Sequence, residues 1–330
     1  MFIRPGLAHP VRRPLTEVIP LMADPSTAWQ DGTHAVAAGI RRRVFEHVLR
    51  NGEGYLSQAC SAAEMLAMLY TRTLNLAPVD APIRPGAFLG VPGPQTPGYE
   101  TGGIYNGRRG PGLDRFIFSP AQYALALYAT LIEVGRLAPE GLEDFNRDGG
   151  TVEMIGAEHS PGIETTTGSL AQALSQASGI AVGRRLRGDT GKVWVMMSDG
   201  EFEEGQTWEA IANAAFHRID NLRVVVDANG QQCDGLVANV AHLEPLADRI
   251  RAFGASCDEV DGHDLDALDY AMRRPSDRPH VVLARTDPTR GVPLLAEKAP
   301  LLHTLRFASS AERDRFEVAY VAMAGEAGMR

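Results

Sequence analysis

The stretch that decides the fold spans residues 198–235 and reads SDGEFEEGQTWEAIANAAFHRIDNLRVVVDANGQQCDG. One apolar run, residues 193–197, leads into its opening Ser-Asp-Gly, and a second apolar run, residues 222–226, leads into Asp-Ala-Asn-Gly. A cluster of acids and a helical pattern lie between the two runs. This order predicts two buried parallel strands joined by a crossover helix.

Two polar residues, Asp199 and Asn229, stand where the two predicted strands end. Ligands of such sheets bind just outside the carboxyl ends of the strands. A carboxylate and an amide oxygen suit a hard divalent cation such as Mg²⁺, which keeps phosphate and water as further ligands. Gly200 would let backbone approach a phosphate closely. The alternative is two ordinary turns, because Asp, Asn and Gly dominate turns in general.

The composition is that of a globular protein, with 44% hydrophobic and 22% charged residues among 330. This length allows one large or two ordinary domains. The net charge of -9 argues against a nucleic-acid or acidic-membrane surface. It allows a phosphorylated ligand, because Mg²⁺ and backbone N–H groups supply local positive potential.

The three cysteines, Cys60, Cys233 and Cys257, are scattered along the chain. Their odd number and spacing give neither a disulfide framework nor a metal motif, so we expect a reducing cytoplasm. The sequence has no apolar run long enough to span a bilayer. Its first fifteen residues are basic without an apolar core, so we expect no secretory signal.

Helical and strand patterns alternate along the rest of the chain. They predict helices at residues 36–49, 61–74, 121–134, 168–186 and 311–324, and strands at 115–119, 193–197, 222–226, 257–260 and 280–285. This alternation predicts a doubly wound α/β fold, a mainly parallel sheet with helices on both faces. We expect one such domain over residues 33–305, between an extension (1–32) and a C-terminal helix and tail (306–330).

Two segments carry further expectations. Residues 78–112 are dense in Pro and Gly, and a loop this long is usually functional or mobile, although an insertion without a role remains an equal alternative. The predicted helix 168–186 carries small residues at Ser175, Gly179 and Gly183. Because glycine inside a helix costs about 1 kcal/mol against alanine, we expect another helix or backbone to approach closely there.

The opening stretch closely resembles the thiamine diphosphate signature of the transketolase family, Gly-Asp-Gly followed one crossover later by an Asn that ends the next strand. Ser198 replaces the first Gly, while Asp199, Gly200 and Asn229 stand at the family spacing. The resemblance implies Mg²⁺, or Ca²⁺ or Mn²⁺ in its place, held by Asp199, Asn229 and the backbone carbonyl of Gln231. It also implies that Gly200 and Glu201 bind the cofactor diphosphate.

A second match is PGIETTTGSLAQAL at residues 161–174, similar to the family's Pro-Gly-Val-Glu-x-Thr-Thr-Gly-Ser-Leu-Gly-Gln-Gly-Leu. By resemblance, Gly168 and Leu170 line the thiamine cofactor. From the residues alone, a helix start opened by Gly168 would accept anions at its N–H groups. A plain helix start capped by Thr167 or Ser169 explains the same letters.

Three further segments are similar to the family. Glu204 and Glu209 match acids that the family places at its dimer interface, although acids near a helix start also simply complement its dipole. The segment Val-Asp-Gly-His-Asp at residues 260–264 matches a structural segment, with Asp264 a natural helix cap and His263 a structural histidine. His303 stands near the family histidine that lies beside the thiazolium and substrate.

The pattern breaks where the family has other histidines. Tyr55 and Gln122 occupy two of those positions, and His159 lies near a third at a different offset. Together with His303, these side chains would face substrate. Tyr and Gln can hydrogen-bond but cannot act as general acids or bases near neutral pH. Cofactor binding therefore looks retained and donor handling altered, with a 2-oxo acid or an unusual ketose as candidate donors.

The resemblance covers residues 33–305, the diphosphate-binding domain of the family. The family's pyrimidine-binding domain, which carries the glutamate that activates the cofactor, would follow and does not. We therefore expect one subunit of a split, α2β2 transketolase-like enzyme that transfers a ketol or acyl fragment to an aldehyde. The alternatives are a subunit of a 2-oxo-acid decarboxylating or acyloin-forming enzyme and a non-catalytic partner subunit. A nicotinamide-binding protein is disfavoured, since no Gly-x-Gly-x-x-Gly follows a strand.

Overall fold

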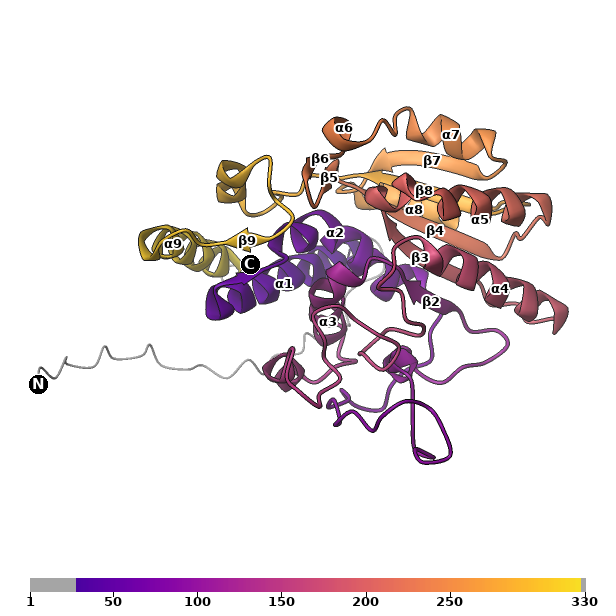
Figure 1. Cartoon of the computed structure of the whole chain (residues 1–330), viewed down its shortest axis with the longest axis horizontal. Coiled ribbons are helices and arrows are strands. Elements are labelled where there is room, and N and C mark those ends of the chain that lie inside the picture. Colours follow the sequence, from indigo (N-terminus) through magenta and orange to yellow (C-terminus); the bar gives the residue numbers. More distant parts are fainter. Residues whose placement is uncertain (1–27, 328–330) are drawn as a thin grey trace, which may run out of the picture.

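A five-stranded parallel sheet forms the centre of the computed structural model, which describes residues 28–327. The strand order is β2-β3-β4-β8-β7, as Figure 1 shows on the right of the molecule. The strands are β2 (Arg115–Phe118), β3 (Val193–Ser198), β4 (Leu222–Ala228), β7 (Ser256–Asp261) and β8 (His280–Arg285). Every residue of β4 is buried, as expected of a central strand covered on both faces.

Helices cover the sheet on both faces, because alternate residues of each strand point to opposite sides. One hydrophobic cluster joins Phe116, Trp194 and Val225 to helices α1 (Ala28–Asn51), α2 (Leu56–Met68), α3 (Ala124–Glu133), α8 (Leu265–Arg273) and α9 (Ser310–Ala327). The other joins Ile117, Val195 and Val224 to α4 (Gln172–Leu186), α5 (Gly205–Phe216) and α7 (Leu246–Ala252). The predicted doubly wound fold is confirmed.

Several short elements lie outside the five-stranded sheet. They are the pair β1 (Glu53–Gly54) and β9 (Leu305–Arg306), the hairpin β5 (Gln231–Gln232) and β6 (Gly235–Leu236), and α6 (Val237–Val240). Single turns of helix lie at η1 (Leu69–Thr73), η2 (Gly102–Asn106), η3 (Ala121–Tyr123), η4 (Pro139–Asp144), η5 (Asp199–Glu203) and η6 (Pro293–Lys298). The pairing of β1 with β9 joins two segments that lie far apart in the chain.

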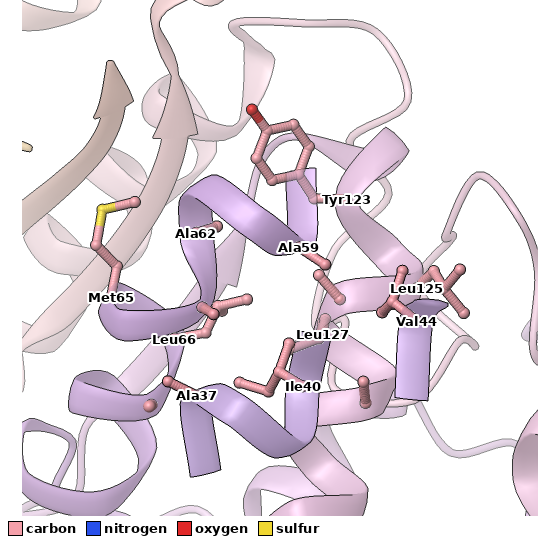
Figure 2. Close-up of a cluster of buried hydrophobic side chains, with 14 of the residues drawn as sticks. Ala37, Ile40, Val44, Ala59, Ala62, Met65, Leu66, Tyr123, Leu125 and Leu127 are labelled. Carbon is pink, nitrogen blue, oxygen red and sulfur yellow. The ribbon is translucent and has the colours of Figure 1, made fainter. Parts of the chain in front are cut away.

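The first three helices share a tightly packed core. Figure 2 shows Ile40 and Val44 of α1, Leu66 of α2 and Leu127 of α3 meeting between the helices. The ring of Tyr123 lies at the rim of this cluster, and its hydroxyl points away from the apolar side chains (Figure 2). A hydrophobic base thus presents one polar group toward the strand ends.

The predicted strands and helices appear at their places, with corrections to the starts of four helices. The helix predicted from residue 36 begins at Ala28, so residues 28–32 belong to this helix and not to the expected extension. The helix predicted from residue 61 begins at Leu56, and the one predicted from residue 121 begins as the 3-10 turn η3. The helix predicted from residue 168 begins at Gln172, after Ala171 in a left-handed conformation with φ 68. Neither Thr167 nor Ser169 caps it, and the hydroxyl of Thr167 donates instead to the carbonyl oxygen of Phe118.

The loop of residues 78–112 packs against the segment that precedes α4. The N–H of Gly102 donates to the carbonyl oxygen of Glu158 at 2.7 Å, and the Tyr99 hydroxyl donates to the Glu158 carboxylate at 3.0 Å. A Cβ on Gly102 would stand 1.7 Å from the carbonyl oxygen of Ser160, so only glycine fits there. The loop is therefore a built part of the fold, with η2 inside it.

Among the small residues of α4, Ser175 accepts a hydrogen bond from Nε2 of Gln206 on α5 at 3.3 Å. The two glycines have no close neighbour on another element within residues 28–327. A Cβ on Gly179 would have no atom within 4 Å, and one on Gly183 would have only a side-chain nitrogen of Arg187 at 4.0 Å. The expected close approach of a helix or backbone is therefore wrong at Gly179 and Gly183 within residues 28–327. Over the same residues, no helix combines the length and the apolar character needed to cross a membrane.

Candidate functional site

Asp199 and Asn229 lie next to each other at the carboxyl ends of β3 and β4. The N–H of Gly230, directly after Asn229, donates to Oδ2 of Asp199 at 2.7 Å, and the N–H of Gly200 donates to Oδ1 at 2.9 Å. Strand pairing sets this proximity, because Ser198 is in register with Asp227. Asp199 and Asn229 therefore stand together at one edge of the sheet.

A second acid, Asp227, lies behind this pair and is fully buried. Its carboxylate accepts hydrogen bonds from the hydroxyls of Ser61 at 2.6 Å and Thr286, and from Nδ2 of Asn229 at 3.2 Å. The same Nδ2 lies 3.0 Å from the hydroxyl of Tyr123. Our sequence reasoning passed over Asp227, although an acid that ends a buried apolar run is itself a signal.

The surroundings shift the pKa of both carboxyls upward. Burial, followed by the charge of Asp227, raises the pKa of Asp199 to about 7. Burial also raises the pKa of Asp227, although hydrogen bonds from Ser61, Thr286 and Tyr123 oppose that shift. Two acids held in low dielectric favour a positive partner.

These groups fit a hard divalent cation. Asp199 is 4% exposed, and within residues 28–327 its oxygens accept only backbone N–H groups, which leaves lone pairs for a metal. Oδ1 of Asn229 accepts from the N–H of Gln231 at 2.9 Å, so the turn holds the amide and the Gln231 backbone together. No group of three or more His, Cys, Asp or Glu side chains that could hold a metal occurs within residues 28–327. A cation here would therefore rely on amide, carbonyl and phosphate oxygens.

A cavity of about 260 Å³ opens beside Asp199 and Gly230. Its lining is mainly apolar, and it is closed by the segment that follows β6 together with Glu244 and Arg285. Asp199 lines this cavity and Asp227 does not. The two acids thus differ in access, one toward open space and the other toward protein.

Glu201 binds within the protein instead of offering its side chain to a ligand. Its buried carboxylate accepts from the hydroxyl of Ser119, from the N–H of Ala171 at 3.1 Å and from the N–H of Ser198 at 2.8 Å. Burial raises the pKa of this carboxyl. The carboxylate ties the ends of β2 and β3 to the start of α4, so only the backbone of Glu201 can contact a diphosphate.

Gly168 and Leu170 lie in the segment that this carboxylate anchors. Gly168 is exposed, and a Cβ there would meet only Ile155, at 3.6 Å. Leu170 is half-buried. The segment therefore has an open side next to the strand ends, which is compatible with the predicted contact to a cofactor.

Tyr55 and His303 meet although 248 positions separate them in the chain, and their ring centroids lie 5.4 Å apart, edge to face. Pairing of β1 with β9 brings the two segments together. Nε2 of Gln58 lies 3.3 Å from Nδ1 of His303 and donates to the His303 carbonyl oxygen at 2.9 Å. Sequence reasoning missed Gln58, which sits one helical turn after Tyr55.

This contact defines the state of His303. Burial lowers the pKa of His303, so its imidazole is neutral at neutral pH. Because the Gln58 amide donates to Nδ1, the ring proton resides on Nε2. His303 can therefore donate a hydrogen bond from Nε2.

The other two predicted substrate residues are less closely associated. The half-buried side chain of Gln122 makes no hydrogen bond to any residue of the described part of the chain. His159 stacks on Phe88 of the long loop, with ring centroids 4.4 Å apart, and its Nε2 lies 3.1 Å from Glu153. His159 therefore contacts the long loop, and within residues 28–327 it contacts neither Tyr55 nor His303.

Glu204 and Glu209 are exposed at the start of α5 and on its first turns.

His263 is structural as expected: Nδ1 lies 2.9 Å from Glu64, and Nε2 accepts from the N–H of Asp287 at 2.8 Å. Although burial alone would raise it, hydrogen bonds from His263 and Arg41 hold the pKa of Glu64 down at about 2. Asp264 caps α8, also as expected.

Comparison with known proteins gives a consistent result. A family model described as "Transketolase, thiamine diphosphate binding domain" matches residues 108–301, which begins after most of the long loop. The transketolase family protein y4mO of Sinorhizobium fredii is 35% identical over 77% of this chain and 85% of its own length. The 6-deoxy-6-sulfo-D-fructose transketolase subunit SqwG of Clostridium sp. is 31% identical over 76% of this chain and 83% of its own.

Solved structures show the same fold. Transketolase from Campylobacter jejuni superposes with a TM-score of 0.67 at 21% identity and covers 91% of this chain. The chain spans 48% of that protein. At this identity the likeness concerns the fold alone.

Proposed function

The chain belongs to the transketolase family, through its thiamine diphosphate binding domain, and we propose that it binds thiamine diphosphate and Mg²⁺ as one subunit of a transketolase-like enzyme. The enzyme transfers a ketol or acyl fragment from a donor to an aldehyde acceptor. It acts in the cytoplasm, a proposal supported by three free cysteines.

One observation carries this proposal: Asp199 and Asn229 stand side by side at two adjacent strand ends. The N–H of Gly230 links them by a 2.7 Å hydrogen bond to Asp199. Both side chains are held by backbone donors, so little ordering is needed when a cation arrives. Asp199, Asn229 and the carbonyl of Gln231 would hold Mg²⁺, with Ca²⁺ or Mn²⁺ as substitutes.

The other residues have supporting roles. The backbone at Gly200 and Glu201 would face the diphosphate, and Gly168 and Leu170 would line the thiamine rings. The cofactor bound there would supply a nucleophilic carbon and an electron sink for cleavage of a C–C bond beside a carbonyl. His303, neutral and protonated on Nε2, would donate a hydrogen bond to an oxygen of the donor.

We further propose a separate second polypeptide, in an α2β2 assembly. Support comes from the Clostridium relative, whose name describes a subunit and of which this chain covers 83%, against 48% of the Campylobacter transketolase. Glu204 and Glu209 would lie at the contact between two copies of this chain. Their exposure at the start of α5 leaves them accessible for that contact.

A second candidate reaction is decarboxylation or acyloin formation from a 2-oxo acid. Tyr55 and Gln122 favour it, because neither side chain can exchange a proton at neutral pH as the family histidines do. Burial raises the pKa of Tyr55 further above its ordinary value. A product assay with ketose phosphates against 2-oxo acids separates the two reactions.

The test of cofactor binding is calorimetric titration of thiamine diphosphate with Mg²⁺ into the full chain, alone and mixed with the candidate second subunit. Asp199→Ala is the control for the cation site. We expect binding that the second subunit strengthens and that the variant loses. Absence of binding in every mixture would refute the catalytic proposal and leave a subunit that keeps the fold without the cofactor.

A further inference from the structure

We propose that Asp227 is a positioning residue that fixes the amide of Asn229 in one orientation, with Oδ1 toward the cation and Nδ2 toward the protein. Asp227 itself would not touch the cation. The inference rests on the proposed function only in that the cation is the reporter of the Asn229 orientation.

The surroundings of the Asn229 amide nitrogen carry this inference. Three oxygens lie around Nδ2: the Ser61 hydroxyl at 3.2 Å, the Tyr123 hydroxyl at 3.0 Å and Oδ2 of Asp227 at 3.2 Å. On its other side, Oδ1 accepts from the N–H of Gln231 at 2.9 Å. Rotating the amide by half a turn would set Oδ1 against the Asp227 carboxylate and Nδ2 against an N–H, so both contacts would become repulsive.

Asp227 is itself held from several elements. Ser61 comes from α2, Tyr123 from η3 and Thr286 from the residue that follows β8. The ring of Tyr123 is anchored in the apolar cluster, and only its hydroxyl reaches out (Figure 2). The carboxylate therefore has little freedom to move toward a ligand.

The two acids of the site consequently have different roles. Asp199 accepts only backbone N–H groups from the described residues and lines the cavity of about 260 Å³. Asp227 has no exposed surface, and side-chain donors occupy both of its oxygens. The first is placed to bind a cation directly, and the second is placed to orient a neighbour that does.

The test is a double-mutant cycle with Asp227→Asn and Asn229→Ala on the full chain, mixed with its second subunit where that strengthens binding. Mn²⁺ is titrated in the presence of thiamine diphosphate, and free Mn²⁺ is measured by electron paramagnetic resonance. Circular dichroism and thermal melting report whether each variant folds. Asp234→Asn, at the exposed tip of the hairpin, removes the same charge nearby without touching Asn229.

If Asp227 acts through Asn229, Asp227→Asn weakens Mn²⁺ binding about 10- to 100-fold in the wild-type background. In the Asn229→Ala background its effect shrinks to about twofold or less. Asp234→Asn also stays within about twofold. Equal weakening in both backgrounds, or weakening by Asp234→Asn as large as by Asp227→Asn, would show that Asp227 acts through its charge and would overturn the inference.

A charge-neutral variant covers the case in which Asp227→Asn does not fold. Thr286→Val keeps the Asp227 charge and removes one donor to its carboxylate. We expect severalfold weaker Mn²⁺ binding with melting close to wild type, and unchanged binding would overturn the inference. Wild-type chain that binds no Mn²⁺ even with its second subunit would instead overturn the proposed function together with this inference, so the two failures are distinguishable.

Discussion

Replacing Asp199 by Asn should make the cation-free chain more stable at alkaline pH, which is unusual for the loss of a buried polar contact. Burial and the charge of Asp227 raise the pKa of Asp199 from 3.8 to about 7. The folded state thus retains a proton that the unfolded chain releases between these two values. Stability therefore falls as pH rises from about 4 to about 7, and the full loss is present above pH 7.

The size of the effect follows from the same values. Each pKa unit corresponds to about 1.4 kcal/mol, so the raised pKa of Asp199 costs about 4 kcal/mol at pH 8. About 2.5 kcal/mol of this falls between pH 5 and pH 8. Asparagine carries no charge at either pH and loses one hydrogen bond, worth about 1 kcal/mol. We therefore expect the free energy of unfolding of Asp199→Asn, relative to that of the wild type, to rise by about 2.5 kcal/mol from pH 5 to pH 8.

Urea unfolding at pH 5 and pH 8, without divalent cations and with a chelator, measures this difference. Asp148→Asn, at an exposed position, is the matched control and should show no pH-dependent gain. Adding Mg²⁺ with thiamine diphosphate at pH 8 should raise wild-type stability and leave the variant unchanged. A difference between variant and wild type that is the same at both pH values would refute the reasoning about the buried acid.

Three further predictions test other parts of the site. Glu201→Gln should lower the free energy of unfolding by about 1–3 kcal/mol, because the amide nitrogen of the variant would face N–H donors that bond to the carboxylate in the wild type. Chemical denaturation measures this change. Gln58→Leu should raise KM for the donor, because His303 loses the partner of its Nδ1, and should lower the melting temperature, because the His303 carbonyl oxygen also loses its donor; steady-state kinetics and thermal melting of the assembled enzyme decide it. Iodoacetamide should label Cys233 and spare the two buried cysteines in the native chain, as peptide mass spectrometry would show, and labelling of all three would contradict the structure.

The sequence predicted the parts of the site that local patterns control. Asp199 and Asn229 each follow an apolar strand run, and the carboxyl ends of adjacent parallel strands must meet at one edge. The fold class followed from the same alternation of periods. In contrast, the start of α4 was placed four residues too early, because the N–H of Ala171 bonds to Glu201, a contact that local propensity does not contain.

Contacts between distant segments account for what the sequence did not predict. Tyr55 reaches His303 because two strands of only two residues each pair, and such short strands leave no periodic pattern. Asp227 acquires its partners from α2, η3 and the end of β8, at separations of up to 166 residues. The local sequence determines which residues stand at a strand end, and tertiary packing determines which of them face a ligand.

The charge at the strand ends determines how a cation and a diphosphate affect each other's binding. The chain carries a net charge of -9, and the strand ends add two buried acids at the place proposed for a diphosphate. A diphosphate alone would meet like charge in low dielectric, which is unfavourable. A divalent cation removes that repulsion and stabilises the ionised form of Asp199, so cation and diphosphate should bind cooperatively, each strengthening the other by the same factor. Titration of each in the absence and presence of the other would reveal this coupling, and independent binding would contradict the placement of both at these strand ends.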